Sequence, residues 1–148
     1  TKDDTHSGYV SVNKSWDELK ECELVPFISV LDKADTIMVS HITVTSIDKL
    51  PSSLSYEIIT RKLRNELGYN GVIITDSMAM GAVADSYTSD IAAVMAVKAG
   101  ADIILMPESL EKSFNAVLNA VNSGEISMER LDESVLRILK MKAKYKLI

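Results

Sequence analysis

Residues Gly68–Val83, which read GYNGVIITDSMAMGAV, are the most informative part of this sequence for its fold. Gly68 and the pair Asn70-Gly71 are turn residues, and the apolar run Val72–Ile74 after them is typical of a strand buried on both faces of a parallel sheet. Asp76 follows closely after this run. Ligands bind at the carboxyl ends of the strands in parallel α/β folds, so its position makes Asp76 a candidate for a functional site.

The segments on either side of this stretch alternate between helical and strand patterns. Residues 1–13 are polar and predict a loop, and Ser15 and Glu18 have the spacing of a capping box at the start of a helix. Apolar spacing predicts helices at 15–33, 55–67, 89–99, 109–121 and 127–145, with a kink or a new start at Pro26, and strands at 36–42, 72–74 and 101–106. This alternation indicates right-handed βαβ units and a parallel sheet. Three strands are few for a doubly wound sheet and too few for a whole (β/α)8 barrel. The pattern therefore leaves two architectures open, a small doubly wound sheet or a piece of a barrel.

The composition is that of an ordinary globular domain with one core. The chain has 148 residues, of which 47% are hydrophobic and 25% charged. No apolar run approaches the roughly 20 residues of a bilayer helix. The net charge of -5 and the scattered Lys and Arg residues argue against a nucleic-acid partner. The single cysteine, Cys22, excludes an internal disulfide and a cysteine-based zinc site, and its place in a helical pattern predicts a buried thiol.

Three other positions are candidates for chemistry beside Asp76, which by position alone is a nucleophile, a phosphoacceptor, a metal ligand or a cap. His41 also stands at a strand end, where a histidine has either a working or a structural role. Asp4 and His6 are two residues apart in an extended segment, so the carboxylate can hold the imidazole and prepare it for proton transfer. Chance occurrence in a polar segment is the competing explanation for this pair.

Two methionines follow the acid. Met78 and Met80 are expected to line a pocket or to pack beneath the loop. No glycine-rich phosphate loop is present, because the Gly68-x-x-Gly71 pair precedes a strand, whereas the phosphate-binding patterns follow one.

The longer run Leu63–Val83, LRNELGYNGVIITDSMAMGAV, resembles the nucleophile signature of glycoside hydrolase family 3. It is most similar to the bacterial β-N-acetylhexosaminidase branch of that family. Flanking segments also fall where the family has similar ones, namely 23–27 (ELVPF), 38–42 (MVSHI), 54–55 (LS) and 99–102 (AGAD). The resemblance therefore covers nearly the whole chain.

The resemblance implies a partial (β/α)8-type barrel that contains strands six to eight. Residues 1–148 would form a single incomplete domain, in which 1–13 is a catalytic loop and 127–148 a terminal helix. Asp76 matches the catalytic nucleophile, and Asp4 and His6 match an Asp-x-His acid/base dyad on the loop after strand five. His41, Met78 and Met80 are carried over as substrate contacts or as support for the site. Ser77 departs from the family, where a second Asp is common.

The implied activity is retaining hydrolysis of terminal β-linked N-acetylglucosamine, with peptidoglycan fragments as a plausible source. The resemblance implies no cofactor and no metal. The family's sugar-gripping Lys-His segment and strands one to five precede the part matched here, so we expect the chain to be inactive alone. We also expect it to pair with the missing barrel half or with another copy. A bacterial protein of the cytoplasm or the cell envelope fits this resemblance.

Two alternatives come from other classes of protein. A phosphoacceptor receiver domain also has a strand-end aspartate followed by Met in an alternating α/β chain. It needs an acidic pair after its first strand and a lysine after a later one, whereas Asp3-Asp4 precede every predicted strand and Pro107-Glu108 follow the last. A non-catalytic, sugar-binding relative is the other alternative, and the presence of Asp4, His6 and Asp76 argues against it.

Overall fold

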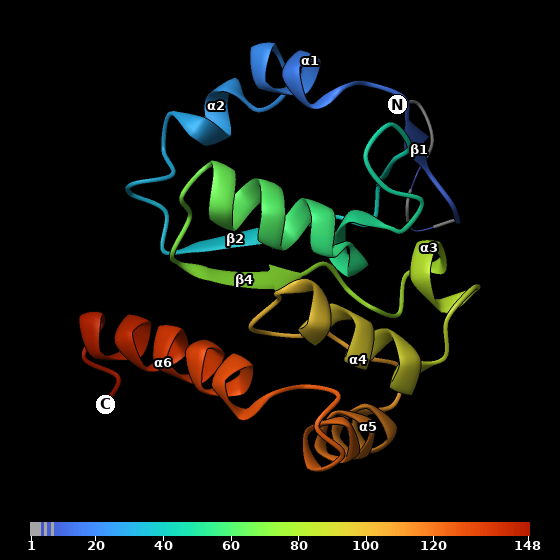
Figure 1. Ribbon diagram of the computed structural model, residues 1–148, viewed down its shortest axis with the longest axis vertical. Coiled ribbons are helices and arrows are strands. Elements are labelled where there is room, and N and C mark those ends of the chain that lie inside the picture. The colour runs from blue at the N-terminus through green and yellow to red at the C-terminus, as the bar shows by residue number, and fades with distance from the viewer. Residues whose placement is uncertain (1–3, 5, 7) are drawn as a thin grey trace.

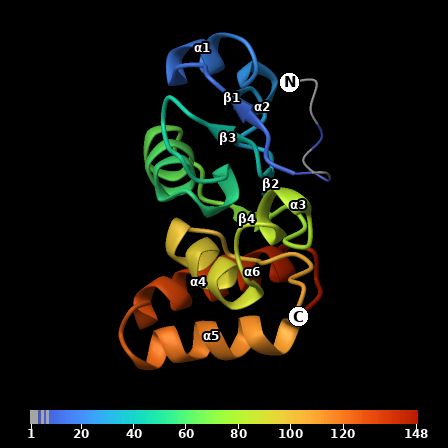
Figure 2. The ribbon, with the colours of Figure 1, turned by 90° about the vertical axis from the view of Figure 1, so that its right-hand side faces the viewer.

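The computed structural model describes residues 4, 6 and 8–148 and contains short parallel strands flanked by helices (Figure 1). The elements follow in the order β1 (Ser11–Val12), α1 (Trp16–Glu21), α2 (Val25–Ile28), β2 (Thr36–Val39), β3 (Thr43–Val44), η1 (Ser52–Leu54), η2 (Glu57–Glu66), β4 (Val72–Thr75), α3 (Gly81–Ala84), α4 (Ser89–Ala99), α5 (Leu110–Asn122) and α6 (Met128–Lys144). Figures 1 and 2 show α1 and α2 at one end of the molecule and α5 at the other. No helix in the described part of the chain has the length and apolar character that a membrane span requires.

The central sheet pairs β2 with β4 in parallel. Thr36 lies opposite Val72 and Val39 opposite Thr75, so both strands end at the same edge of the sheet. The helix η2 connects them and is a π-helix, in which the amide of Leu67 donates to the carbonyl of Lys62 five residues earlier. The parallel pairing predicted from the alternation of elements is confirmed.

The prediction of a regular third strand over 101–106 is wrong. This segment runs parallel to β4 but forms only an isolated bridge, between Ile74 and Ile103. The ladder does not continue because the amide of Leu105 donates to the side-chain hydroxyl of Thr75, at 3.0 Å, in place of a backbone carbonyl. Met106 then adopts a left-handed backbone with φ 45°, which ends the extended run.

The amino-terminal third differs from the prediction in three ways. Residues 1–13 are not all loop, because β1 pairs in parallel with β3. The strand predicted over 36–42 ends at Val39, and the next two paired residues, Thr43 and Val44, form β3 in a separate two-stranded sheet. The helix predicted through Lys33 ends earlier, at Ile28. Pro26 lies at the start of a second helix, α2, which was one of the two expectations for this proline.

The capping box at α1 is confirmed, and the burial of Cys22 is not. Ser15 accepts from the amide of Glu18, and the Glu18 carboxylate accepts from the amide of Ser15. Cys22 is exposed because it is the carboxyl-terminal cap of a helix that has no buried residue. Apolar residues at helical spacing predict a helix, but its apolar face is buried only where another element packs against it.

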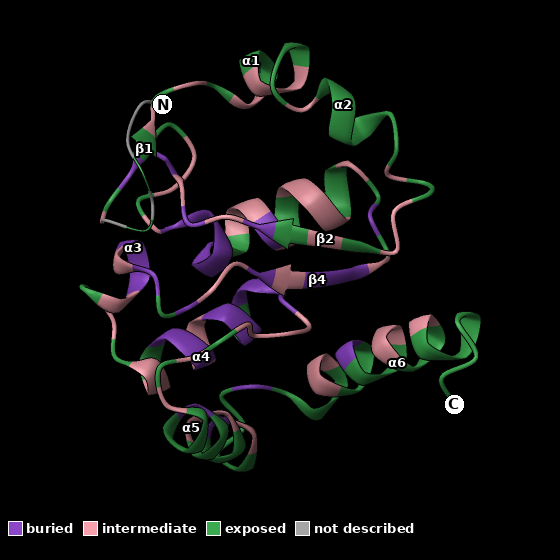
Figure 3. Cartoon of the chain, turned by 180° about the vertical axis from the view of Figure 1, so that it is seen from behind, coloured by how far each residue is buried: buried purple, intermediate pink, exposed green. Residues whose placement is uncertain are grey.

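The hydrophobic core lies between the sheet, η2 and α4, where buried residues gather (Figure 3). Ile59, Ile73 and Val83 are completely buried, and burying a side chain of this size stabilises the fold by about 1.5–3 kcal/mol. The buried face of α4 is made of four alanines and Val97, and these small side chains let it pack closely against α5 and η1. The core therefore holds β4, the strand that carries Asp76 at its end, in the middle of the molecule.

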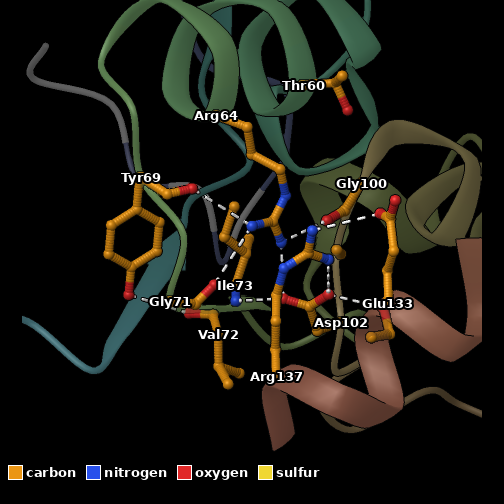
Figure 4. Close-up of polar contacts among 12 residues, drawn as sticks. Thr60, Arg64, Tyr69, Gly71, Val72, Ile73, Gly100, Asp102, Glu133 and Arg137 are labelled. Carbon is orange, nitrogen blue, oxygen red and sulfur yellow. Dashed lines mark hydrogen bonds and ion pairs between the residues drawn. The ribbon is translucent and has the colours of Figure 1, made fainter.

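A buried ionic network supports β4 from its other end (Figure 4). The carboxylate of Asp102 is fully buried and accepts from Arg64 on η2 at 2.6 Å and from the amide of Ile73 at 2.8 Å. On α6, Ser134 donates to it at 2.6 Å and Arg137 at 3.2 Å. One carboxylate thus joins η2, β4 and α6.

Candidate active site

Asp76 lies at the carboxyl end of β4, half-buried, where the sheet opens. Its amide donates to the carbonyl of Val39 on β2 at 2.9 Å, which continues the parallel pairing by one residue. Its Oδ1 accepts from the amide of Ser77 at 2.8 Å. The backbone of Asp76 is therefore part of the sheet, and its carboxylate is oriented by the next residue.

The chain turns sharply after Asp76. The amide of Met80 donates to the carbonyl of Ser77 at 3.0 Å, and the amide of Met78 donates to the carbonyl of Leu105 at 2.9 Å. The side chains of Met78 and Met80 are 4% and 6% exposed, and Met78 belongs to the main core cluster. Both side chains lie beneath the turn. Contact with a substrate stays a prediction for them, and packing is the role that the described contacts support.

His41 lies immediately beside this turn and is only 1% exposed. Its Nε2 is 2.9 Å from the carbonyl oxygen of Ser77, and its Nδ1 is 2.6 Å from Oγ of Ser53. A carbonyl oxygen can only accept, so Nε2 carries the proton and Nδ1 of the neutral ring accepts from the Ser53 hydroxyl. Both ring nitrogens are engaged by the protein, which leaves neither for a sugar hydroxyl.

Burial lowers the pKa of His41 below its usual value of 6.5. The bond to Ser77 and the nearby negative charge of Asp76 act in the opposite direction and are the smaller effects. The ring is therefore held in its neutral form at neutral pH.

Asp4 and His6 form the pair that their spacing suggested. Nδ1 of His6 is 2.9 Å from Oδ1 of Asp4, and the amide of His6 donates to the same oxygen at 3.0 Å. Both side chains are exposed. The backbone and side-chain hydrogen bonds from His6 lower the pKa of Asp4. The carboxylate consequently stays ionised and orients the imidazole, with Nε2 left facing away from the pair.

The segment that carries the dyad approaches the helix that follows Asp76. The amide of Gly81, the first residue of α3, donates to the carbonyl of His6 at 3.4 Å. A Cβ at position 81 would lie 3.2 Å from this carbonyl oxygen and 3.2 Å from the amide nitrogen of Gly8. Glycine at 81 therefore permits the approach. No described hydrogen bond joins His6 to Asp76 directly.

Sequence reasoning missed Ser53 and Gly81. Ser53 is completely buried, and its amide donates to the carbonyl of Ser40 at 3.1 Å. A serine pair after Pro51 was visible as the end of a connection, but nothing local signalled that Ser53 would meet a histidine twelve residues earlier.

Two hollows on the described surface lie away from these residues. One, of about 420 Å³, is at the amino ends of β2 and β4 and includes Asp35 and Gly71. The other, of about 790 Å³, lies beside η1, η2 and α4 and includes Tyr56 and Ile91. Neither is lined by Asp76, His6 or His41. Across residues 4, 6 and 8–148, no three His, Cys, Asp or Glu side chains are grouped so that they could hold a metal ion.

Comparison with known proteins gives a consistent family. The profile described as the glycosyl hydrolase family 3 N terminal domain matches residues 1–141. Beta-hexosaminidase A of Pseudoalteromonas piscicida is 29% identical over 164 residues, which covers 95% of this chain and 27% of that protein. The chain therefore spans about a quarter of the length of this relative.

Comparison with solved structures supports the same family. A glycoside hydrolase family 3 β-N-acetylglucosaminidase from Paenibacillus sp. str. FPU-7 superimposes with a TM-score of 0.91 and 39% identity, covering 95% of this chain and 28% of that one. The β-glucoside phosphorylase BglX superimposes with a TM-score of 0.89 and 30% identity, covering 97% and 28%. The expectation of parallel βα units from a partial (β/α)8-type barrel is confirmed. The chain belongs to glycoside hydrolase family 3 and is part of the N-terminal domain of that family.

Proposed function

We propose that this chain supplies the reacting groups of a retaining β-N-acetylglucosaminidase. Asp76 is the nucleophile, and the dyad of Asp4 and His6 is the acid/base. The observation that carries the proposal is the position of Asp76 at the carboxyl end of a parallel strand, with the dyad-bearing segment bonded to the start of the next helix. The 39% identity to a β-N-acetylglucosaminidase supports the substrate class.

The reaction has two steps. The carboxylate of Asp76 attacks the anomeric carbon of the sugar while Nε2–H of protonated His6 gives its proton to the departing glycosidic oxygen, which leaves a covalent glycosyl-enzyme. Neutral His6 then takes a proton from a water molecule as the water attacks the same carbon and releases Asp76. Two inversions at this carbon retain its configuration.

A histidine suits this exchange because imidazole changes its charge near neutral pH, so one side chain can give a proton and then take one. Asp4 holds Nδ1 of His6 at 2.9 Å, which directs Nε2 toward the reaction. Asp76 must be ionised to attack, and the amide of Ser77 orients its carboxylate.

The sugar pocket is completed from outside this chain. Both described hollows lie away from Asp76, and the Pseudoalteromonas and Paenibacillus relatives are each more than three times as long as the segment they share with this chain. We therefore propose that the 148-residue chain is inactive alone and that its partner is the remaining part of a barrel. A second copy of the chain is the alternative partner. The substrate is a carbohydrate, and peptidoglycan fragments are a candidate source of it.

A grafted enzyme tests the proposal. Residues 1–148 would replace the matching segment of the Paenibacillus enzyme, and release of nitrophenol from nitrophenyl β-N-acetylglucosaminide would be followed. We expect activity in the graft, none in the chain alone, and a loss of roughly 10³-fold or more in Asp76→Ala. Asp85→Asn, which changes an exposed acid near the same turn, is the matched control and should stay active.

Analysis of the products distinguishes retention from inversion and hydrolysis from phosphorolysis. A retaining enzyme releases the β-anomer first, which proton NMR detects before mutarotation. Added phosphate would give a sugar 1-phosphate if phosphorolysis is preferred, as the likeness to BglX allows. An active Asp76→Ala graft, or a first product of inverted configuration, would refute the proposed role of Asp76.

A further inference from the structure

The backbone of Ser77 forms hydrogen bonds to three neighbouring groups. Its amide donates to Oδ1 of Asp76 at 2.8 Å, and its carbonyl accepts from the amide of Met80 at 3.0 Å and from Nε2 of His41 at 2.9 Å. The orientation of Ser77 therefore determines where the carboxylate of Asp76 points. The bond from Met80 is an ordinary turn bond, whereas the bond from His41 reaches across from the end of the neighbouring strand.

The imidazole of His41 is itself fixed by a residue from a third segment. The Ser53 hydroxyl donates to Nδ1 at 2.6 Å, and both residues are buried, with exposures of 0% for Ser53 and 1% for His41. Ser53 is in turn bonded through its amide to the carbonyl of Ser40. This arrangement selects the Nε2–H tautomer, the only neutral form that can donate to Ser77.

We propose that His41, fixed by Ser53, is a positioning residue that holds Ser77 and thereby aims the carboxylate of Asp76. The inference rests on the proposed function of Asp76 as the nucleophile. It gives His41 a role without substrate contact, since both of its ring nitrogens are engaged within the protein. Burial, which lowers the pKa of His41, supports the same neutral state.

Misplacing a reacting group by about 1 Å costs on the order of 100-fold in rate. In the grafted enzyme, His41→Phe keeps a flat ring but cannot donate to Ser77, so we expect kcat to fall by roughly 10–100-fold with KM changed by less than about twofold. The substrate is bound by other residues, so the loss should appear in the chemical step.

Two amides of different length separate positioning from packing. The amide of His41→Gln can reach the place of Nε2 and donate to Ser77, whereas the shorter His41→Asn reaches only the place of Nδ1. We expect Gln to restore most of kcat and Asn to restore little. Ser113→Ala is the matched control, because Ser113 is also buried and hydrogen-bonded to a serine, Ser89, but lies away from Asp76.

The tautomer can be observed in the 148-residue chain itself, without any enzymatic assay. Nitrogen-15 NMR of the imidazoles should show His41 neutral at pH 7 with the proton on Nε2, and Ser53→Ala should leave the proton on Nε2, because the Ser77 carbonyl can only accept. A proton on Nδ1, or an imidazolium at neutral pH, would overturn the inference even if every variant failed to fold.

The kinetic outcomes are equally decisive. An unchanged kcat in His41→Phe, equal rescue by Gln and Asn, or an equal loss in Ser113→Ala would each refute positioning while leaving Asp76 as nucleophile. A graft that retains its activity in Asp76→Ala refutes the proposed function instead, so the two failures are distinguishable.

Discussion

Nη2 of Arg64 lies 2.6 Å from Oδ2 of Asp102, in a pair whose carboxylate has no exposed surface. Two arginines of α6 share the other carboxylate oxygen, Arg137 at 3.2 Å and Arg130 at 3.8 Å. Burial lowers the pKa of Arg64, and the charge of Asp102 opposes that effect. The network lies near the amino-terminal end of β4, where Asp102 accepts from the amide of Ile73 (Figure 4).

Removing this carboxylate should destabilise the fold strongly. Asp102→Ala leaves buried arginines without their counter-charge, and breaking a buried pair from one side costs about 3–5 kcal/mol of unfolding free energy. Urea denaturation of the chain measures this loss of unfolding free energy. Glu133→Ala removes an exposed partner of Arg137 and should cost at most about 1 kcal/mol. Similar costs for the two variants would contradict the importance given to burial.

Two glycines at positive φ should respond differently to alanine. Gly100 caps α4 with φ 118°, and an added Cβ would lie 2.5 Å from Oγ1 of Thr60 and 2.9 Å from Cγ2 of Ile59. Gly124 has φ 78°, and nothing lies within 4 Å of such an atom.

We therefore expect Gly124→Ala to cost about 1–2 kcal/mol from backbone strain alone. Gly100→Ala adds overpacking of about 1–3 kcal/mol to a comparable strain. Thermal or urea unfolding of both variants gives the difference. Equal losses would mean that the contact with Thr60 relaxes freely.

Stability should fall as the solution is acidified below the ordinary pKa of histidine. The pKa of His41 is lowered by burial, so below about pH 6.5 the unfolded chain takes up a proton that the folded chain resists. Folding free energy is thus lost as pH falls from 6.5, until the folded pKa is reached and the loss levels off.

Urea titrations between about pH 7.5 and pH 5 measure this slope. His41→Gln removes its part of the slope. The chain has one other histidine, so His6→Gln is the matched control and keeps the contribution of His41. An identical slope in His41→Gln and in the unsubstituted chain would exclude this explanation.

The open edge of β2 should cause self-association of the isolated chain. In the described part of the chain β2 pairs with β4 alone, and an unpaired strand edge invites another strand. Met38 on β2 is 54% exposed, so Met38→Lys should shift sedimentation toward monomer. Met128 on α6 has the same exposure, and Met128→Lys should leave association unchanged. A monomeric unsubstituted chain at high concentration would count against this expectation.

Local patterns in the sequence were enough to predict β4, the position of Asp76 at its end, the capping box at Ser15 and the spans of α4, α5 and α6 within one or two residues. Each of these depends on neighbours in the chain, such as turn glycines, cap side chains and apolar spacing. The contact between Asp4 and His6 was also predictable, because two residues of extended backbone bring their side chains to one side.

The strand that carries Asp76 and the family of the chain could therefore be derived from local patterns of residues. The single bridge formed by 101–106, the pairing of β1 with β3 and the exposure of Cys22 became evident in the folded chain. So did the enclosure of His41 between Ser53 and Ser77. The physical reason is that each of these depends on groups distant in the chain, whose hydrogen bonds and burial exist only once the elements have packed. No local pattern of residues records which groups will meet.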